Sequence, residues 1–410
     1  MSAAPVTNTM TLVPEPVTLR QYARNWFMGL RNGELGALPI VIGLLVIAVV
    51  FQSMNSNFLT AGNFVNLMVQ GAAMATIAMG VVFVLLIGEI DLSLGYVSGV
   101  GAVLTALFLL PDGAQLPTGV ALVGAVFAGA LIGLLHGLLI TKLKIPSFVV
   151  TLAGFLGWNG VVLLLIGSRG SIIIQDKTVV GLASEFLLPA VAWGLLALCV
   201  LAYAATQLVQ RAQRQKNNLA VDPLSIIVLR VGALAVFGGA VVLVSNLSRG
   251  IPYVFVLVGV LFLLCTFVLT RTKFGIWVYA IGGSIEAARR AGINTDRVRI
   301  ACFMICSSLA VTGGIILSSR LRSVDSNAGG GSLLLYSIAA AVIGGTSLFG
   351  GRGSARSAIL GALVIAAIDN GLGLLGLGSG QKFVITGLVL LAAVAVDALS
   401  QKGRVRAGKG

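Results

Sequence analysis

Charged side chains are scarce in this sequence. Only 10% of its 410 residues are Asp, Glu, Lys or Arg, whereas a soluble domain has about 25%. Histidine occurs once, at His136, which excludes a metal centre built from several histidines and weighs against a proton-relay mechanism. The four cysteines lie inside apolar segments without zinc-ligand spacing, so they should behave as small apolar side chains. We therefore predict no metal site.

Long apolar runs dominate the sequence. The chain is 58% hydrophobic, and runs long enough to cross a hydrocarbon layer recur along it. We predict an all-α polytopic membrane protein with about 10–12 transmembrane helices. The first, third, tenth and twelfth apolar stretches are short or interrupted by glycine, so some are expected to be half-helices. The predicted stretches are residues 37–51, 64–88, 92–110, 118–140, 147–167, 186–209, 224–244, 251–270, 299–318, 334–349, 355–375 and 381–399.

The basic residues orient these stretches. Most of the 27 Lys and Arg residues fall in loops on the side that also holds both termini, and such loops face the cytoplasm. We therefore expect a multi-pass membrane protein with both termini cytoplasmic. No basic stretch is interleaved with aromatic residues, so the net charge of +14 does not indicate a nucleic-acid partner.

The chain divides into two apolar halves around a polar loop. Two segments, 79–106 and 339–366, each place a Gly- and Ser-rich interruption between apolar runs, which predicts a parallel internal repeat; shared composition would explain the likeness equally well. The predicted parts are a cytoplasmic lead-in (1–36), a first transmembrane half (37–209), a cytoplasmic loop (210–223), a second transmembrane half (224–400) that contains a cytoplasmic segment (271–298), and a basic cytoplasmic tail (401–410).

One cytoplasmic stretch has its own helical pattern. Ser284 is the expected N-cap, Glu286 lies in the first turn where the helix dipole favours an acid, and Gly292 can close the C-terminus. A short amphipathic helix on the cytoplasmic face is predicted, and its role should be contact with a partner.

Two pairs of polar residues interrupt the apolar runs. Glu89 and Asp91 stand two apart, and Asp369 precedes Asn370. Ionisable groups inside membrane segments usually face the interior of the bundle or a wet cavity, which would place these residues on a translocation pathway. For Glu89 and Asp91 a second interpretation stays open, in which they lie at the inner headgroup level where two helices turn.

Glycines four residues apart mark a close helix contact. Gly129, Gly133 and Gly137 make one smooth face of a predicted helix, on which another backbone can lie. We expect packing within the chain rather than a dimer face. GRVRAGKG (403–410) and GLGLLG (371–376) match nucleotide-loop spacings but lack the strand and helix context, so any ATP would be bound by another subunit.

Five motifs, in order along the chain, resemble one family. They are GEIDLSLG (88–95), KIPSFVVTLAG (144–154), YAIGGSIEAARRAGI (279–293), AAAVIGGTSLFGGRGS (339–354) and AIDNGL (367–372). They are similar to motifs of the membrane permeases of bacterial ABC importers for monosaccharides, the ribose, arabinose and xylose group related to the branched-chain amino-acid permeases. Within that group the pattern looks most like the D-xylose permeases.

The resemblance implies roles for particular residues. An ATPase-coupling motif corresponds to Ser284, Glu286, Ala287, Ala288 and Gly292. Glu89, Asp91 and Ser93 correspond to an acidic element in the first half of the family, and Thr346 corresponds to a Gly-rich element in the second half. Together with Asp369 and Asn370, these residues make up the expected translocation pathway.

The function implied is that of a permease subunit in an ATP-driven importer for a monosaccharide, D-xylose or another pentose. Such a subunit has no catalytic residue and no cofactor of its own, because ATP and magnesium are bound by the partner ATPase. The expected partners are an ATP-binding subunit, an extracytoplasmic sugar-binding protein, a second copy of the permease, and membrane lipid. The main alternative is a secondary transporter driven by an ion gradient, in which Glu89, Asp91 and Asp369 carry protons or coordinate sodium.

Overall fold

The computed structural model describes residues 38–111, 113–217, 219, 221–389 and 391, together with Arg24 and Met28. The predicted tail 401–410, and the lead-in 1–36 apart from these two residues, lie outside the described part. Within it, the strands are β1 (Ser171–Ile173) and β2 (Ser323–Asp325), which pair antiparallel. The helices are α2 (Leu38–Met54), α3 (Ala61–Leu86), α4 (Leu94–Leu109), α5 (Thr118–Lys142), α6 (Ser147–Ile166), the 3₁₀ turn η1 (Gly167–Arg169), α7 (Lys177–Ser184), α8 (Pro189–Lys216), α9 (Leu224–Asn246), α10 (Tyr253–Arg271), α11 (Lys273–Gly283), α12 (Ile285–Arg290), α13 (Thr295–Leu321), α14 (Leu333–Ile343) and α15 (Ala355–Leu374).

Eight of the described helices are long and apolar enough to cross a membrane, by length and composition. Three further apolar helices are shorter, namely α2, α4 and α14. The prediction of an all-α polytopic membrane protein is therefore confirmed. The strand pair, α7 and α11 were not expected from the sequence.

The chain forms two compact units, and the smaller of them spans Leu188–Asn246. It consists of α8 and α9, two apolar helices joined by a polar loop. In that loop Asp222 forms an ion pair with Arg230 at 3.0 Å, and its carbonyl accepts a hydrogen bond from Arg211. Ala192 is the buried residue of α8, and apolar side chains such as Leu201 and Phe237 are exposed on the two helices.

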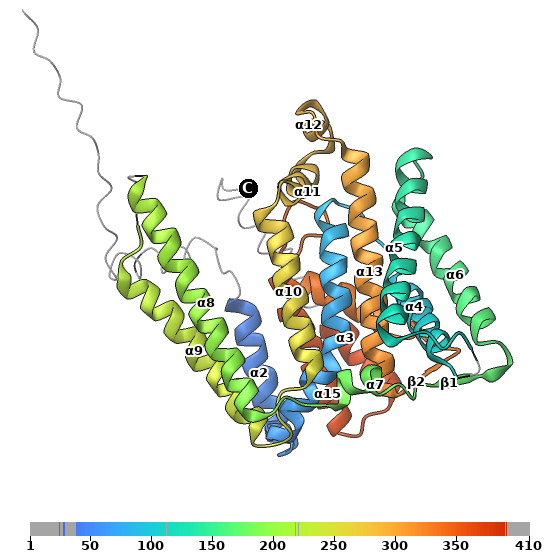
Figure 1. Ribbon diagram of the computed structural model, residues 1–410, viewed down its shortest axis with the longest axis horizontal. Helices are drawn as coiled ribbons and strands as arrows, with labels where there is room; N and C mark the ends of the chain where they lie inside the picture. The colour runs from blue at the N-terminus through green and yellow to red at the C-terminus, as the bar shows by residue number, and fades with distance from the viewer. Residues whose placement is uncertain are drawn as a thin grey trace, which may run out of the picture. The chain divides into compact units, whose positions relative to one another are not determined.

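The larger unit is built around α3 and α13, which run side by side through its centre (Figure 1). Most of α3 is buried, and α13 is buried along the faces that meet α3 and α5. Successive long helices run in opposite directions, so the unit has two distinct ends. We call them the α12 end, where α10 finishes and α13 begins, and the strand end, where β1 and β2 lie.

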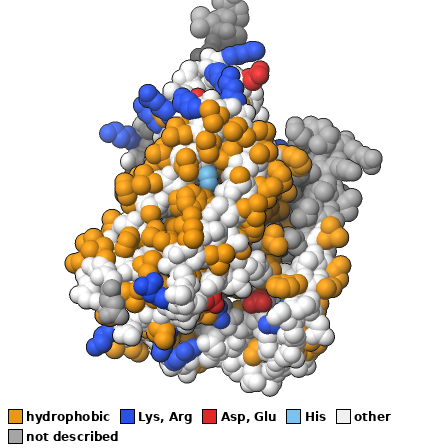
Figure 2. All heavy atoms as spheres, turned by 90° about the vertical axis from the view of Figure 1, so that its right-hand side faces the viewer, with side chains coloured by type: hydrophobic (Ala, Val, Ile, Leu, Met, Phe, Trp, Pro, Cys, Tyr) orange, Lys and Arg blue, Asp and Glu red, His pale blue; other side chains and the backbone are white. Residues whose placement is uncertain are grey.

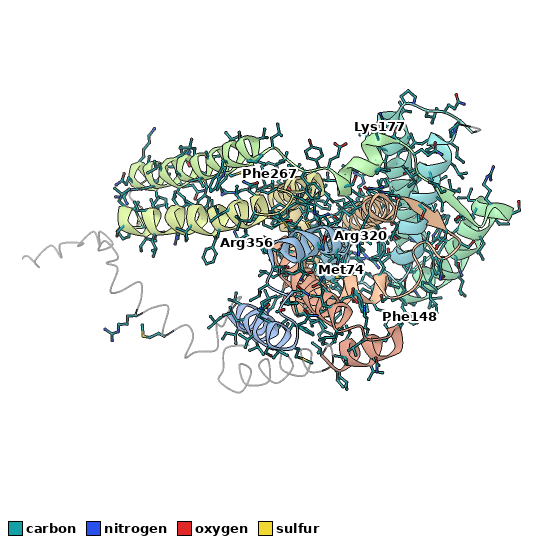
Figure 3. All side chains as sticks on the ribbon, turned by 90° about the horizontal axis from the view of Figure 1, so that it is seen from below. Met74, Phe148, Lys177, Phe267, Arg320 and Arg356 are labelled. Carbon is teal, nitrogen blue, oxygen red and sulfur yellow. The ribbon has the colours of Figure 1, made fainter. Side chains whose placement is uncertain are left out.

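A broad apolar surface covers the side formed by α5 and α6. Figure 2 shows orange side chains across this face, with blue Lys and Arg side chains above and below them. Phe148 of α6 is 53% exposed, whereas Met74 of α3 lies in the middle of the unit (Figure 3). A continuous exposed apolar band of this extent is what lipid tails cover.

The predicted glycine face of α5 lies against α13. A Cβ on Gly133 would come within 2.4 Å of the Phe303 carbonyl oxygen, and one on Gly129 or Gly137 would also collide with α13. The two backbones therefore touch, as small residues four apart permit. This contact lies within the chain.

Replacing Gly133 with alanine should separate α5 from α13, because its Cβ would meet backbone atoms that cannot turn away. We expect a loss of about 1–3 kcal/mol of stability, measured as a lower thermal-unfolding midpoint of the purified protein in detergent. Gly157→Ala in α6 is the matched control, because a Cβ added there would meet no atom within 4 Å. Equal effects of the two substitutions would contradict the close contact.

Candidate functional site

The polypeptide between α3 and α4 is non-helical, and we call residues 87–93 the first break. Gly88 has φ +75°, which lets the chain turn out of α3. Asp91 is only 3% exposed. One of its carboxylate oxygens, Oδ1, accepts hydrogen bonds from the Ser93 N–H (2.9 Å) and the Ser93 hydroxyl (2.6 Å). The carboxylate thus lies at the N-terminus of α4, where the helix dipole favours a negative charge.

A chain of side chains reaches this carboxylate from two other helices. The indole N–H of Trp158 on α6 donates to His136 Nε2 on α5 at 3.1 Å. A ring that accepts at Nε2 carries its proton on Nδ1, and Nδ1 lies 3.4 Å from the Ser93 hydroxyl oxygen. Every donor therefore points the same way, from Trp158 through His136 and Ser93 to Asp91. We call these four residues the relay.

The second carboxylate oxygen of Asp91 is buried without a hydrogen-bond partner among the described residues. Asp91 also lines a cavity of about 10 Å³ whose other walls are apolar. That volume is near the smallest that holds one water molecule. The relay therefore fixes one oxygen of Asp91 and leaves the other available.

Glu89 and Asp91 have different environments although they stand two residues apart. Glu89 forms an ion pair with Arg299 in the first turns of α13, and both side chains are mostly buried. Glu89 thus ties the first break to the helix that follows α12, whereas Asp91 points into the bundle.

A second break, residues 344–354, separates α14 from α15. Gly345 has φ +101°, and the N–H of Thr346 donates to the Ala341 carbonyl at 3.0 Å. The Thr346 side chain is 2% exposed, and its hydroxyl has no partner among the described residues. Gly353 lies against it, since a Cβ there would come within 2.7 Å of the threonine methyl group.

The two breaks meet each other and α11. The N–H of Gly351 in the second break donates to the carbonyl of Leu86, the last residue of α3, at 2.9 Å. A Cβ on Gly282 of α11 would lie 1.9 Å from the same Leu86 oxygen and 2.4 Å from the Gly351 nitrogen. Three backbone segments therefore pack together here with no side chain between them. We call this contact the backbone junction.

Tyr279 gives α11 a further connection to the second break. Its hydroxyl donates to the Gly353 carbonyl at 2.8 Å. Burial raises the pKa of the Tyr279 phenol, so it stays a neutral donor.

The short helix α12 projects from the same end of the unit (Figure 1). The Ser284 hydroxyl caps it by accepting from the Ala287 N–H at 3.2 Å. Gly292 follows with φ +82°, a conformation that suits glycine at a helix C-terminus. Glu286 and Ala287 are exposed, and Ala288 is buried against the unit. The structure therefore brings the predicted coupling residues into one capped, outward-facing turn.

Asp369 and Asn370 lie on α15, away from the breaks. The Asn370 amide exchanges hydrogen bonds with Asn63 of α3 at 2.8 and 2.9 Å and donates to Gln70 at 3.3 Å. Asp369 instead attracts the Arg320 guanidinium of α13. Among the described residues, these two therefore share no hydrogen bond or ion pair with Glu89, Asp91, Ser93 or Thr346.

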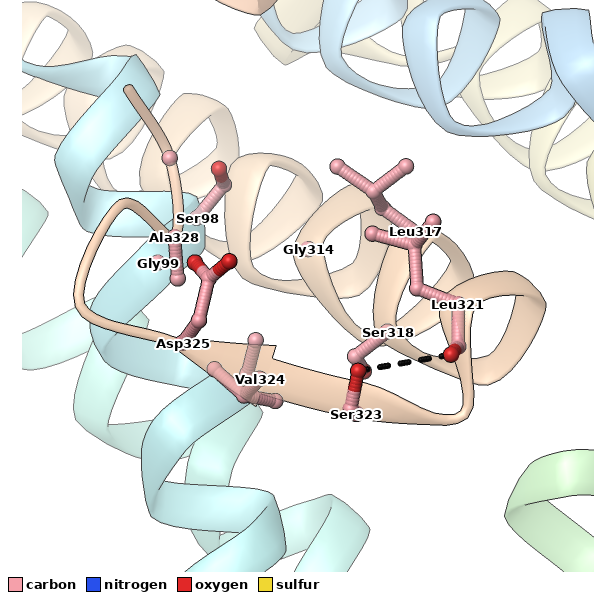
Figure 4. A pocket seen from close by; sticks show the side chains of 12 residues that line it. Ser98, Gly99, Gly314, Leu317, Ser318, Leu321, Ser323, Val324, Asp325 and Ala328 are labelled. Atoms are coloured by element: carbon pink, nitrogen blue, oxygen red, sulfur yellow. Dashed lines mark hydrogen bonds between the residues drawn. The ribbon is translucent and has the colours of Figure 1, made fainter. Parts of the chain in front are cut away.

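Three features of the site were missed at the sequence level. Trp158 and Gly282 carry contacts that only the fold brings together, although the Gly282-Gly283 pair directly before Ser284 was a visible signal. The third is a cavity of about 50 Å³ near the strand end (Figure 4). Ser98, Ser318 and Asp325 give it polar walls.

The relay predicts coupled losses of stability. Trp158→Phe leaves His136 Nε2 without a donor, and Ser93→Ala removes the link to Asp91, so each should cost about 1–3 kcal/mol. The double variant should lose less than the sum, because one chain of hydrogen bonds is broken in both. Thermal unfolding of the purified variants measures this, with Trp277→Phe on the exposed side of α11 as the control. Fully additive losses would contradict a continuous relay.

Comparison with known proteins assigns the chain to a family. The model of the branched-chain amino acid transport system / permease component family matches residues 63–394. The xylose transport system permease protein XylH of Escherichia coli (strain K12) is 33% identical over 392 residues, which are 95% of this chain and 98% of XylH. The Haemophilus influenzae XylH is 35% identical, with 89% of this chain and 97% of the relative covered.

A ribose import permease protein, RbsC of Escherichia coli (strain K12), is 28% identical over 92% of this chain and 96% of its own length. No solved structure matches the chain. The family model and the XylH matches each cover most of the sequence, and the helices needed for a multi-pass membrane protein are present. The chain therefore belongs to the branched-chain amino acid transport system / permease component family.

Proposed function

We propose that this protein is the membrane-spanning permease subunit of an ATP-driven importer for a monosaccharide, D-xylose or another pentose. Its similarity to XylH over nearly the whole of both chains supports the substrate class, and the similarity to RbsC supports a sugar of the same size. The permease binds no cofactor, and ATP and magnesium belong to the partner ATPase.

The backbone junction is the observation that carries this proposal. A partner that moves α12 also moves α11, because Ser284 alone separates the two helices. Gly282 of α11 touches both Leu86 and Gly351, so the displacement reaches the first and second breaks together. An ATPase whose nucleotide states hold α12 differently would thereby bias the helix bundle between two arrangements.

The partners follow from the two ends of the larger unit. The exposed turn at Glu286 and Ala287 is the docking surface for the ATP-binding subunit, with the α12 end in the cytoplasm of a bacterial cell. An extracytoplasmic sugar-binding protein delivers the sugar at the strand end. A second copy of the permease completes a homodimer in the lipid bilayer.

A sugar importer suits the polar groups of the bundle. A pentose is an uncharged polyol, so its pathway requires hydrogen-bonding groups rather than a charged pocket. Asp91 and Thr346 supply two such groups, since one carboxylate oxygen and the hydroxyl have no hydrogen-bond partner among the described residues. The competing function is a secondary transporter, and the ion pair of Glu89 with Arg299 disfavours Glu89 as its proton or sodium carrier.

Reconstituted vesicles distinguish the two functions. We expect uptake of labelled D-xylose or D-ribose to need ATP, the ATPase and the binding protein, and to survive an uncoupler. Glu286→Lys should abolish this uptake while the protein still inserts, because the charge change lies on the docking turn. Uptake driven by an ion gradient alone would contradict the proposal, and normal uptake by Glu286→Lys would contradict the docking assignment.

The backbone junction provides a matched pair of substitutions. Gly282→Ala would push a methyl group into the Leu86 carbonyl, whereas Gly283→Ala meets no atom within 4 Å. We expect Gly282→Ala to lower ATP-dependent uptake by roughly tenfold or more, with the ATPase still bound in co-purification. Gly283→Ala should transport normally. Similar uptake by the two variants would show that coupling does not pass through the junction.

A further inference from the structure

The cavity near the strand end has several polar side chains in its lining. It lies between α4, α13 and β2, and its volume is about 50 Å³. That is room for a few ordered waters and not for a five-carbon sugar. Figure 4 shows the Asp325 carboxylate turned toward α4, with Ser98 nearby and Ser318 and Ser323 on the opposite wall.

The polar side chains of this cavity present acceptors. The hydroxyl of Ser98 donates to the Gly95 carbonyl at 2.5 Å, and that of Ser318 donates to the Ile315 carbonyl at 2.9 Å. Their oxygens therefore offer only lone pairs to the cavity. Asp325 accepts one hydrogen bond, from the Asn327 N–H at 2.9 Å, and its second oxygen adds another acceptor. Such a set is complementary to a ligand whose hydroxyl groups all donate.

One wall of the cavity is not a helix. Residues 326–332, which we call the linker, join β2 to α14 and lie across the first turns of α4. A Cβ on Gly99 would come within 2.1 Å of the Ala328 carbonyl oxygen, and one on Gly95 within 2.6 Å of the Gly329 oxygen. The glycines of α4 thus allow the linker backbone to close on the helix.

The hydrogen bonds of the linker run within it, to β2 and to Gly170, rather than to α4. The N–H groups of Ala328 and Gly330 donate to carbonyls of Asp325 and Asn327, and Ser326 donates to the Gly170 carbonyl. Among the described residues, no hydrogen bond joins the linker to α4. The contact is van der Waals packing between backbones, so the linker can leave α4 without leaving a buried polar group unpaired.

We infer that the linker is a lid over a polyol-binding site, and that an incoming sugar displaces it and donates its hydroxyl hydrogens to Ser98, Ser318 and Asp325. The inference rests on the proposed function, which places the strand end outside the cell. It adds the residues that first contact the sugar within the permease and the segment that closes over them.

The lid is tested by thiol accessibility, which needs no transport. Ser98→Cys is introduced together with Cys199→Ala. Cys199 is exposed and would itself be labelled, whereas the other three cysteines are buried. Gly99→Ala or Gly95→Ala should prop the linker open and raise the rate of labelling by an impermeant maleimide about tenfold. Gly119→Ala, with open space around its Cβ, should leave the rate unchanged. Unchanged labelling in both Gly99→Ala and Gly95→Ala would overturn the lid.

The sugar site is tested by uptake kinetics with D-xylose and D-ribose as probes. Ser98→Ala and Ser318→Ala should each raise KM about fivefold, the equivalent of one hydrogen bond, with the maximal rate little changed. Ser337→Ala is the control, since that buried hydroxyl also bonds its own helix but does not line the cavity. Equal KM for Ser98→Ala and the control would overturn the site.

Two further outcomes distinguish a polyol site from a cation site and from a failure of the proposed function. Asp325→Asn keeps a carbonyl acceptor and should change KM less than Asp325→Ala. If both variants lose uptake completely and uptake by the unaltered protein depends on sodium, the cavity is a cation site and the polyol assignment is overturned. If the unaltered protein takes up neither sugar with ATP and its partners, the proposed function fails, while the labelling result still decides whether the linker opens.

Discussion

Direct contact between backbones governs the larger unit of this protein. At the backbone junction, Gly282, Leu86 and Gly351 approach so closely that one methyl group would not fit. Helix breaks expose peptide groups that water cannot reach inside a membrane, and such groups must be paired within the protein. The Gly351 N–H and the Leu86 carbonyl satisfy each other across the two breaks. The junction therefore satisfies part of the exposed backbone and, by the same geometry, joins α11 to both breaks.

The same principle operates at the other helix contacts. Gly133 lets α5 rest on the backbone of α13, and Gly99 lets the linker rest on α4. Between apolar helices in a bilayer there is little hydrophobic driving force, so close packing and a few hydrogen bonds decide which faces meet. The relay adds polar specificity at one of these contacts, because it joins α5, α6 and the first break through donors that all point toward Asp91.

Composition and apolar run length were sufficient to predict the membrane class, because a bilayer imposes one length on every spanning helix. Capping chemistry was sufficient for α12, since Ser284 and Gly292 act through their own backbone neighbours. Contacts across the chain were not accessible in this way. Trp158 and His136 lie on different helices, and Gly282 meets residues that are far away in sequence. No feature of the neighbouring sequence distinguishes Asn370 from Asp91. Yet Asn370 pairs with Asn63, whereas one oxygen of Asp91 has no hydrogen-bond partner among the described residues.

The two acids of the first break show how a membrane protein can use neighbouring charges differently. Glu89 is neutralised by Arg299 at the α12 end, so it connects the break to the segment that a cytoplasmic partner would move. Asp91 has no basic partner among the described residues and is held instead by two hydrogen bonds from Ser93 at the start of α4. A displacement of α13 would therefore pull on Glu89, and the peptide between the acids would transmit that pull to Asp91. The first break is therefore held at two points by different chemistry, an ion pair to α13 at Glu89 and hydrogen bonds to the start of α4 at Asp91.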